Sequence, residues 1–555
     1  MRLGASDGDD PKARATPLRA LVRFWQDEAG VLTGFSLYIF ILMMMIAGLT
    51  IDIMRYEAVR TRLQATSDRA VLAAADLDQT TDAVAVVEDY FEKAGMSDYL
   101  EGVQVAKGLN YKEVEARVSA EIPTWFMNMS GIDTLNAFAR SKAEERIQNI
   151  EVSLVVDISG SMGSNSKIQN LRTAADKFVR TMMAANDNIT EDGTGLTSVS
   201  IIPYHAVVNV PDYLLAKYNV SKQQEVTNCV RFAPSDFQSI SLSTTDALDR
   251  LAHFDRNNSN LYTQNGDRKI GRPWCQIGDY GAILPLSTSL TDLTGKVASL
   301  GAGGNTATDL GMKWAAALLD PGSQDVVTDL IDEGHLDGAL AGRPVAYEDT
   351  ETIKVIVLMT DGENTSQYDL KNKFKGTMSP VWWDEDSDEF FVYFQNRADQ
   401  NKQPWWDVGR TPESDTNGND AKYGDGDWDP QIERPDARQL SHAELFGTFS
   451  VRYVSEYFFR VENDSQSSIR NDYRNAVTRY TGNSTADDYT EVLCDKLKAK
   501  DVVIFTIGFE APARGQTLMK YCASSSGHYF DVKGVEISEA FSSIANTIQQ
   551  LRLSL

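Results

Sequence analysis

The segment EVSLVVDISGS, residues 151–161, indicates the fold class of this 555-residue chain. It opens with a mostly apolar run, which is typical of a strand buried on both faces of a parallel sheet. Behind it, apolar side chains recur at helical spacing from Ile168 to Met183. One face of a helix is therefore expected to pack on the sheet.

The same alternation of strand and helix recurs farther along the chain. Further strands are expected over residues 198–208, 354–360 and 501–509, and helices over residues 308–319, 487–500 and 538–551. This order predicts an α/β fold with a doubly wound parallel sheet of the Rossmann-like kind. Stretches that do not fit the alternation are predicted to be large insertions, at about residues 209–285, 321–352 and 365–440.

Hydroxyl and carboxylate side chains stand near the ends of the expected strands and at the start of an expected helix. The five candidates are Asp157, Ser159, Ser161, Thr306 and Asp361. Loops beyond the carboxyl ends of parallel strands converge at one edge of the sheet, so we expect these side chains to meet there. Helix capping by the serines and a turn aspartate are the alternatives, each plausible alone.

Five oxygen donors without histidine or cysteine suit Mg²⁺, which takes about six oxygen ligands and keeps water in unfilled positions. Mn²⁺ and Ca²⁺ are the alternatives, whereas zinc or copper would match poorly. Two ionised carboxylates would leave a divalent site near neutral, so a carboxylate of a partner can bind the ion directly. The sequence therefore predicts a site for recognition.

The motif DISGS at 157–161, followed in order by GGNT at 303–306 and LMTDGEN at 358–364, resembles the metal-ion-dependent adhesion site of von Willebrand factor type A domains. The predicted domain covers residues 148–555 with its insertions. The resemblance implies that the hydroxyls of Ser159, Ser161 and Thr306 approach the metal, while Asp157 and Asp361 act directly or through water.

Residues 31–51, VLTGFSLYIFILMMMIAGLTI, form a run of twenty-one residues without a charge. This run is long enough to cross a bilayer as a helix. A cleaved signal peptide would need a short basic head and a small-residue cleavage site, and neither is present. We expect a tail over residues 1–30, a transmembrane helix over 31–54, a stalk helix over 55–77, and a small α+β connector over 78–147.

The flanking charges do not settle the orientation of this helix. The basic residues near the helix are balanced, so the charge rule is tied: Lys12, Arg14, Arg19 and Arg23 on one side against Arg55, Arg60, Arg62 and Arg69 on the other.

Four cysteines favour an oxidising compartment for the large soluble part, with four free buried thiols as the alternative. Sequence order suggests Cys229 with Cys275 and Cys494 with Cys522. Four cysteines nevertheless allow three connectivities.

The segment FWQDEAG at 24–30, the apolar run and LQATSDRAVLAAA at 63–75 resemble pilus-assembly proteins of the TadE/TadG family, from tight-adherence (Flp) pilus systems. A type A domain behind such a segment is similar to the TadG-like members. The resemblance implies a single-pass protein of the bacterial inner membrane with its bulk in the periplasm. A prepilin peptidase would cut after Gly30, but Phe35 replaces the expected glutamate, so the anchor is expected to remain.

The formal net charge of −26 makes nucleic acid an unsuitable partner. The signatures GxxxxGK[ST], GxSxG and HExxH are absent, so we expect no enzyme. A hydrolase would need a histidine within reach of Ser159 or Ser161, and a structural tether with a bracing metal is the third candidate. The predicted function is a metal-dependent module that binds an acidic residue of a pilus or envelope protein.

The third insertion is acidic and rich in tryptophan. Residues 381–436 hold five of the nine tryptophans of the chain. Such rings can form a surface for a partner or a glycan, or they can fill a small core of the insertion itself. Residues 415–420 and 425–429 resemble calcium loops, but neither completes the pattern.

Overall fold

The computed structural model describes residues 29–76, 79, 81–107, 111–146, 148–184, 186, 195–256, 270–400, 402–410, 427–431, 436–461 and 465–553. The chain divides into two compact units, Met1–Arg146 and Ile147–Leu555. The fold is mixed α/β with one long apolar helix near the N-terminus, which confirms that part of the prediction.

The first unit is built on a single long helix. Helix α2, Ala29–Ala75, continues without a break from the predicted membrane span into the predicted stalk. Among the described residues it is the one helix long and apolar enough to cross a membrane.

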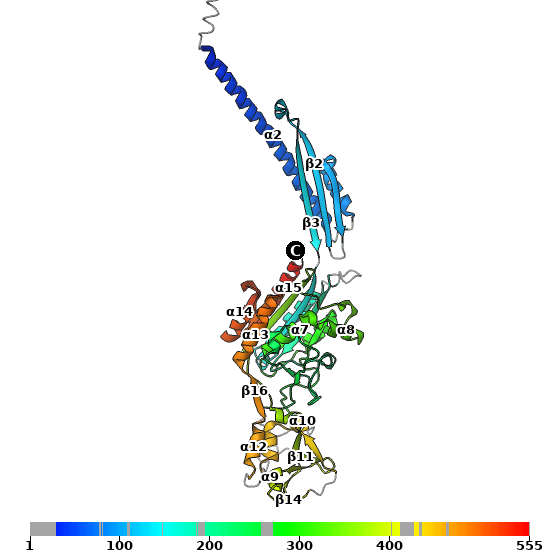
Figure 1. Cartoon of the computed structure of the whole chain (residues 1–555), viewed down its shortest axis with the longest axis vertical. Coiled ribbons are helices and arrows are strands. Elements are labelled where there is room, and N and C mark those ends of the chain that lie inside the picture. Colours follow the sequence, from blue (N-terminus) through cyan, green and yellow to red (C-terminus); the bar gives the residue numbers. More distant parts are fainter. Residues whose placement is uncertain are drawn as a thin grey trace, which may run out of the picture. The chain divides into compact units, whose positions relative to one another are not determined.

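An antiparallel sheet in the order β1-β2-β3 packs on the C-terminal half of α2 and on helix α3, Ala83–Lys93 (Figure 1). Its strands are β1 Leu100–Lys107, β2 Tyr111–Pro123 and β3 Thr134–Arg146. Alternate residues of β2, such as Val114, Ala116 and Val118, are buried because successive side chains of a strand point to opposite faces. The predicted short helix and small sheet are therefore present.

The second unit contains a six-stranded sheet in the order β18-β17-β9-β4-β5-β8. The strands are β4 Asn149–Asp157, β5 Thr197–Tyr204, β8 Leu284–Ser287, β9 Thr352–Thr360, β17 Val503–Phe509 and β18 Tyr529–Val532. Neighbouring strands are parallel except for β8, which runs antiparallel to β5. The carboxyl ends of β4 and β9 therefore lie next to each other.

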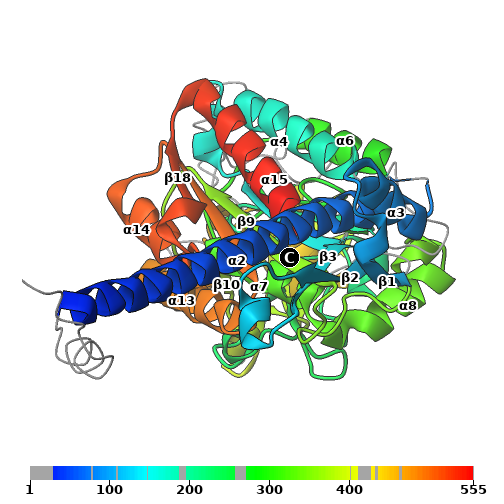
Figure 2. The ribbon, with the colours of Figure 1, turned by 90° about the horizontal axis from the view of Figure 1, so that it is seen from above.

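Helices cover both faces of this sheet (Figure 2). One face carries α4 Lys167–Ala184, α6 Leu290–Ser299 and α15 Ile537–Leu553. The other carries α7 Thr308–Leu319, α13 Asn483–Lys498 and α14 Ala513–Cys522. Each set has its own apolar core against the sheet.

Helix α7 is buried all round because the first insertion packs over its outer side. The Trp314 ring lies 5.7 Å from Tyr218 and 5.9 Å from Phe232. Lys313 lies inside this contact, and its ammonium group donates hydrogen bonds to backbone carbonyls of the insertion. The remaining short elements of the unit are α5 Asp212–Leu215, α8 Gln324–Asp332, α9 Gln395–Ala398, β6 Val230–Arg231, β7 Asp249–Arg250, β10 Gln367–Leu370 and β16 Val477–Thr481.

The third insertion forms its own antiparallel sheet in the order β14-β13-β12-β11-β15, followed by short helices (Figure 1). The strands are β11 Met378–Asp384, β12 Glu389–Tyr393, β13 Trp405–Arg410, β14 Asp427–Asp429 and β15 Arg438–Ser441. The helices are α10 His442–Thr448, α11 Val451–Tyr453 and α12 Ser467–Arg474. Its core continues past residue 440, the predicted end, to Ala476, because these helices close the sheet.

The five tryptophans of this insertion pack mainly against other rings. Trp406 is buried, and its ring lies 5.1 Å from that of Trp428. The Trp382 and Trp405 rings are 5.6 Å apart, and Trp383 stacks on Phe390. Trp383, Trp406 and Trp428 pack in a core that the third insertion shares with the first, whereas Trp382 and Trp405 are half-buried outside it. The interpretation as a core of the insertion itself therefore holds only in part. The first calcium-like stretch, 415–420, lies outside the described residues, as do residues 425 and 426 of the second.

Two disulfides stabilise the second unit. They join Cys229 to Cys275 and Cys494 to Cys522, the pairing that sequence order suggested. The second bridge links α13 to α14 on one face of the sheet, and all four cysteines are buried.

Replacing both Cys494 and Cys522 with alanine should lower the free energy of unfolding of the second unit by about 2 to 4 kcal/mol, because the unfolded chain regains the entropy that the bridge removes. Urea unfolding of the full chain in detergent micelles measures this. The reduced wild-type protein is the control, since it loses the first bridge too and should be at least as unstable. An unchanged unfolding midpoint in the double variant would contradict the expectation.

Candidate metal centre

The carboxylate of Asp157 organises the loop that follows β4. Its Oδ1 accepts a hydrogen bond from the Ser159 amide at 2.8 Å, and its Oδ2 accepts one from the Thr360 hydroxyl at 2.8 Å. Since Thr360 is the last residue of β9, this carboxylate links the ends of two adjacent strands. Asp157 and Ser159 are both buried.

The turn before Thr306 joins this loop through the backbone. The Gly160 amide donates to the Gly304 carbonyl at 2.9 Å, and the Gly303 amide donates to the Ile158 carbonyl at 2.9 Å. A Cβ at Gly160 would come within 3.1 Å of the Gly304 carbonyl oxygen. Glycine at position 160 therefore permits the close approach of the two loops.

The remaining candidate oxygens lie on the same side of these loops. The Ser159 and Ser161 hydroxyl oxygens are 3.1 Å apart, and the Ser161 hydroxyl donates to Asp361 Oδ1 at 2.6 Å. A Cβ at Gly362 would lie 3.3 Å from the Thr306 hydroxyl and 4.0 Å from that of Ser161. The structure thus brings together all five residues that the sequence singled out.

The carboxylates of Asp157 and Asp361 repel each other when both are ionised. Burial and the nearby Asp361 carboxylate raise the pKa of Asp157 to about 7, while hydrogen bonds from Ser159 and Thr360 act in the other direction. A divalent cation would favour the ionised form of both carboxylates. The donors are two carboxylates and three hydroxyls, which suit a hard cation. No group of three or more His, Cys, Asp or Glu side chains placed to hold a metal occurs among the described residues.

A lysine that none of the sequence motifs includes also lies at this cluster. The Lys167 ammonium group lies 3.0 Å from Asp361 Oδ2 and 3.7 Å from Glu510 Oε2, and its side chain is only 9% exposed. A lysine at the start of α4, next to the apolar face of that helix, was the available signal. Its positive charge offsets one carboxylate of the cluster.

A polar cavity of about 360 Å³ lies on the other side of the turn formed by Gly303, Gly304 and Asn305. Among the described residues, its lining includes Arg256 and Arg272 and no acidic side chain. The Arg256 guanidinium lies 3.4 Å above the Tyr368 ring, which restricts its position.

His205 also lines this cavity, and neither of its ring nitrogens has a hydrogen-bond partner within the described part of the chain. Burial lowers the pKa of His205 to about 4, so its ring is neutral at pH 7. All five histidines are among the described residues, and none is hydrogen-bonded to Ser159 or Ser161. Neither Ser159 nor Ser161 therefore has, within the described residues, the histidine partner that a serine nucleophile requires.

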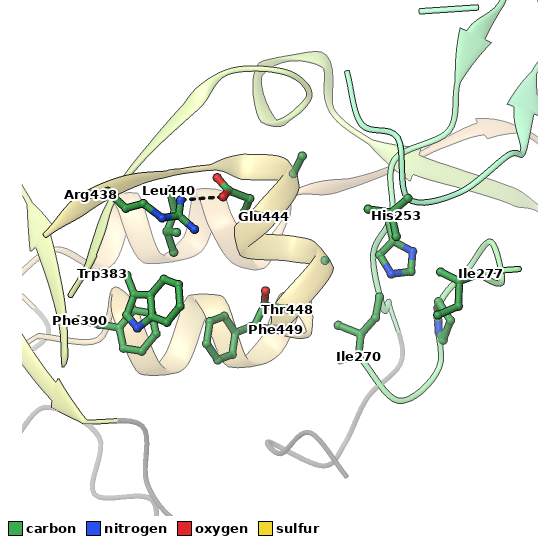
Figure 3. A pocket seen from close by; sticks show the side chains of 14 residues that line it. His253, Ile270, Ile277, Trp383, Phe390, Arg438, Leu440, Glu444, Thr448 and Phe449 are labelled. Carbon is green, nitrogen blue, oxygen red and sulfur yellow. Dashed lines mark hydrogen bonds and ion pairs between the residues drawn. The ribbon is translucent and has the colours of Figure 1, made fainter. Parts of the chain in front are cut away.

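A second, apolar cavity of about 340 Å³ lies between the first and third insertions (Figure 3). Trp383, Phe390 and Phe449 line it from one side, and His253 and Ile277 from the other. The ion pair between Arg438 and Glu444, at 2.7 Å, lies at its edge. None of the five predicted site residues lines this cavity, so it is separate from the candidate metal centre.

Comparison with solved structures finds several pilus proteins. The von Willebrand factor domain of the type V pili tip protein Mfa5 from Porphyromonas gingivalis is 12% identical, with a TM-score of 0.32, covering 74% of this chain and 98% of that one. The PilB minor pilin from Streptococcus sanguinis is 12% identical, with a TM-score of 0.26 and coverage of 81% and 78%.

The sequence comparisons concern the N-terminal segment. No curated protein matches the chain. Residues 30–77 match the family described as "Putative Flp pilus-assembly TadE/G-like". This match confirms the resemblance to TadE/TadG-like pilus-assembly proteins over the apolar run and the helix that continues it.

Proposed function

We propose that this protein is a membrane-anchored, metal-dependent binding module that supports assembly or anchoring of a tight-adherence (Flp) pilus, and surface adhesion. The observation that carries the proposal is the convergence of five oxygen-bearing side chains at the ends of β4 and β9. The match of residues 30–77 supports the pilus context. Helix α2 would anchor the chain in the inner membrane, with the second unit, as a doubly wound type A domain, in the periplasm.

Mg²⁺ would be held by Asp157, Ser159, Ser161, Thr306 and Asp361, with Mn²⁺ or Ca²⁺ as alternatives. When bound, the ion would supply a point of positive charge that attracts an anionic oxygen. The two carboxylates would supply the negative charge that retains it, and the Ser159 and Ser161 hydroxyls are oriented by hydrogen bonds to each other and to Asp361. The proposed chemistry is non-covalent, so the protein is proposed to be a binding protein and not an enzyme.

The partner would present an acidic side chain, because a carboxylate is the group that a nearly neutral divalent site still attracts. The cavity beside the turn at 303–305 favours the same ligand, since Arg256 and Arg272 line it. A short acidic segment of a pilus or envelope protein would meet positive groups at both places. Half-buried rings such as those of Trp382 and Trp405 would make the contact with a surface or glycan that we propose for residues 381–436.

A structural tether with a bracing metal is the second candidate. The loops of the site already contact one another directly, through the bond from Gly160 to Gly304 and the bond from Ser161 to Asp361. Lys167 adds an ion pair to Asp361. These direct contacts contribute to holding the loops together, which favours recognition over bracing.

Asp157→Asn should weaken Mg²⁺ binding by more than about tenfold, because it removes a negative charge while keeping the size of the side chain. Titration calorimetry of the full chain in detergent micelles measures the affinity.

Cells that carry Asp157→Ala should lose their pili, counted by electron microscopy, while the protein still inserts into the membrane.

Asp325→Ala, at an exposed position in α8, is the matched control and should leave metal affinity and pili unchanged. Wild-type metal affinity and wild-type pili in the Asp157 variants would rule out the proposed mechanism.

Lys167→Met should tighten Mg²⁺ binding by about tenfold, equivalent to about 1.4 kcal/mol, because the ammonium group near Asp361 repels the incoming cation. The same calorimetric titration tests this. Lys177→Met removes an equal charge from an exposed position of the same helix and should have little effect. Weaker binding in Lys167→Met would show that the lysine orders the site instead of competing with the ion.

A further inference from the structure

The connection between β2 and β3, residues 124–133 and here called the β2–β3 loop, exposes large apolar side chains. Trp125 is 64% exposed, Met129 80% and Ile132 42%. No charged residue occurs between Pro123 and Asp133. Contiguous exposed apolar side chains on a soluble surface indicate a site for a partner or a membrane.

This loop packs against the apolar part of α2. The Phe126 ring lies where a side chain at Gly48 would be, since a Cβ there would come within 2.4 Å of it. A cavity of about 300 Å³ is lined by α2 within residues 41–49 and by the loop within residues 126–130. The distance along the helix from Ile41 to Ile51, the end of the apolar run, is about 15 Å. The loop therefore lies beside about half of the predicted membrane span.

Polar contacts set the position of the loop along the helix. Asp52, the first charged residue after the apolar run, accepts hydrogen bonds from the amides of Trp125, Phe126 and Met127 at 2.8 to 2.9 Å. The Arg55 guanidinium lies 3.8 Å above the Trp125 ring and donates to the Pro123 carbonyl at 3.2 Å. A tryptophan beside an arginine at the end of an apolar span is typical of the membrane–water boundary.

The backbone of the loop is largely satisfied within the first unit. Besides the three bonds to Asp52, amides of the loop donate to loop carbonyls: Met129 to Phe126, Gly131 to Asn128, Ile132 to Met127, and Thr124 to Asp133. The Thr124 hydroxyl donates to the Ile132 carbonyl. An irregular segment can enter lipid only when its polar backbone groups have such partners.

We infer that the β2–β3 loop inserts into the bilayer beside α2, on the side of the membrane where Asp52 emerges. The inference rests on the proposed anchoring of the chain by α2. The occupant that we assign to the apolar surface is lipid acyl chains, because the surface is continuous with that of α2, whose apolar residues over 31–51 are mostly exposed too. The first unit would thereby contact the membrane at two places, the helix and the loop.

Site-specific labelling can test this in the full chain, because all four native cysteines are in disulfides. Met129→Cys would carry an environment-sensitive NBD fluorophore, and Ile132→Cys gives a second position in the loop. Met43→Cys in the span of α2 is the positive control, and Val535→Cys, 77% exposed in the second unit, is the negative control. The proteins would be reconstituted into vesicles of phosphatidylethanolamine and phosphatidylglycerol, with and without a nitroxide on the acyl chains.

The expected result is blue-shifted emission at positions 129 and 132, quenched by the nitroxide as strongly as at position 43, with no quenching at 535. Quenching at 43 without quenching at 129 and 132 would overturn the inference and leave the anchor intact. Blue-shifted but unquenched emission in the loop would also overturn it, because protein and not lipid would then cover the surface. Absence of quenching at position 43 would reject the membrane anchor itself, and with it the proposed function.

Discussion

The shared carboxylate of Asp157 is the interaction on which the candidate metal centre depends. It accepts hydrogen bonds from the loop of its own strand and from the last residue of β9, so one buried charge defines the spacing of two strand ends. Burying a charge without partners would be costly, and the amide and hydroxyl donors supply the compensation. The same burial makes the group sensitive to the charge of Asp361.

In both units a carboxylate accepts hydrogen bonds from the amides of a loop. In the second unit Asp157 follows a buried strand and accepts a bond from the amide of the loop behind it. In the first unit Asp52 follows an apolar helical run and accepts bonds from three amides of the β2–β3 loop. In both cases a carboxylate at the end of an apolar segment orders an irregular loop that regular secondary structure cannot hold. Each of these loops carries the feature to which we assign a binding role.

The insertions shape the surroundings of the metal centre. The chain leaves β5 through His205 and enters a core shared by the first and third insertions, where Ala206 and Val207 are buried. Trp274, next to the disulfide-bonded Cys275, packs in the same core. The cavity with Arg256 and Arg272 is a product of this packing. A minimal sheet with covering helices would leave that side of the turn at 303–305 open to solvent.

The main elements of the second unit could be predicted from the sequence. Periodicity located β4, β9, α4 and α7 to within a few residues, because strands and helices buried against a core carry apolar residues at regular spacing. That Asp157 and Asp361 lie close together was also predictable, since parallel strands bring their carboxyl ends to one edge. Their role as metal ligands stays a prediction. The predicted end of the third insertion, residue 440, was too early, since its core continues to Ala476. The short helices that close its sheet have no strong hydrophobic period, so the sequence did not indicate them.

Local sequence therefore determined which segments become strands and helices, which run is apolar enough to span a bilayer, and which oxygens stand at strand ends. Tertiary structure alone decided that Lys167 contacts both Asp361 and Glu510, that two arginines line a cavity beside Thr306, and that residues 124–133 lie along α2. These contacts join side chains far apart in the chain and depend on the path of loops and insertions. Such a path has no periodic signal, since it is set by packing between elements and not by the spacing of residues within one.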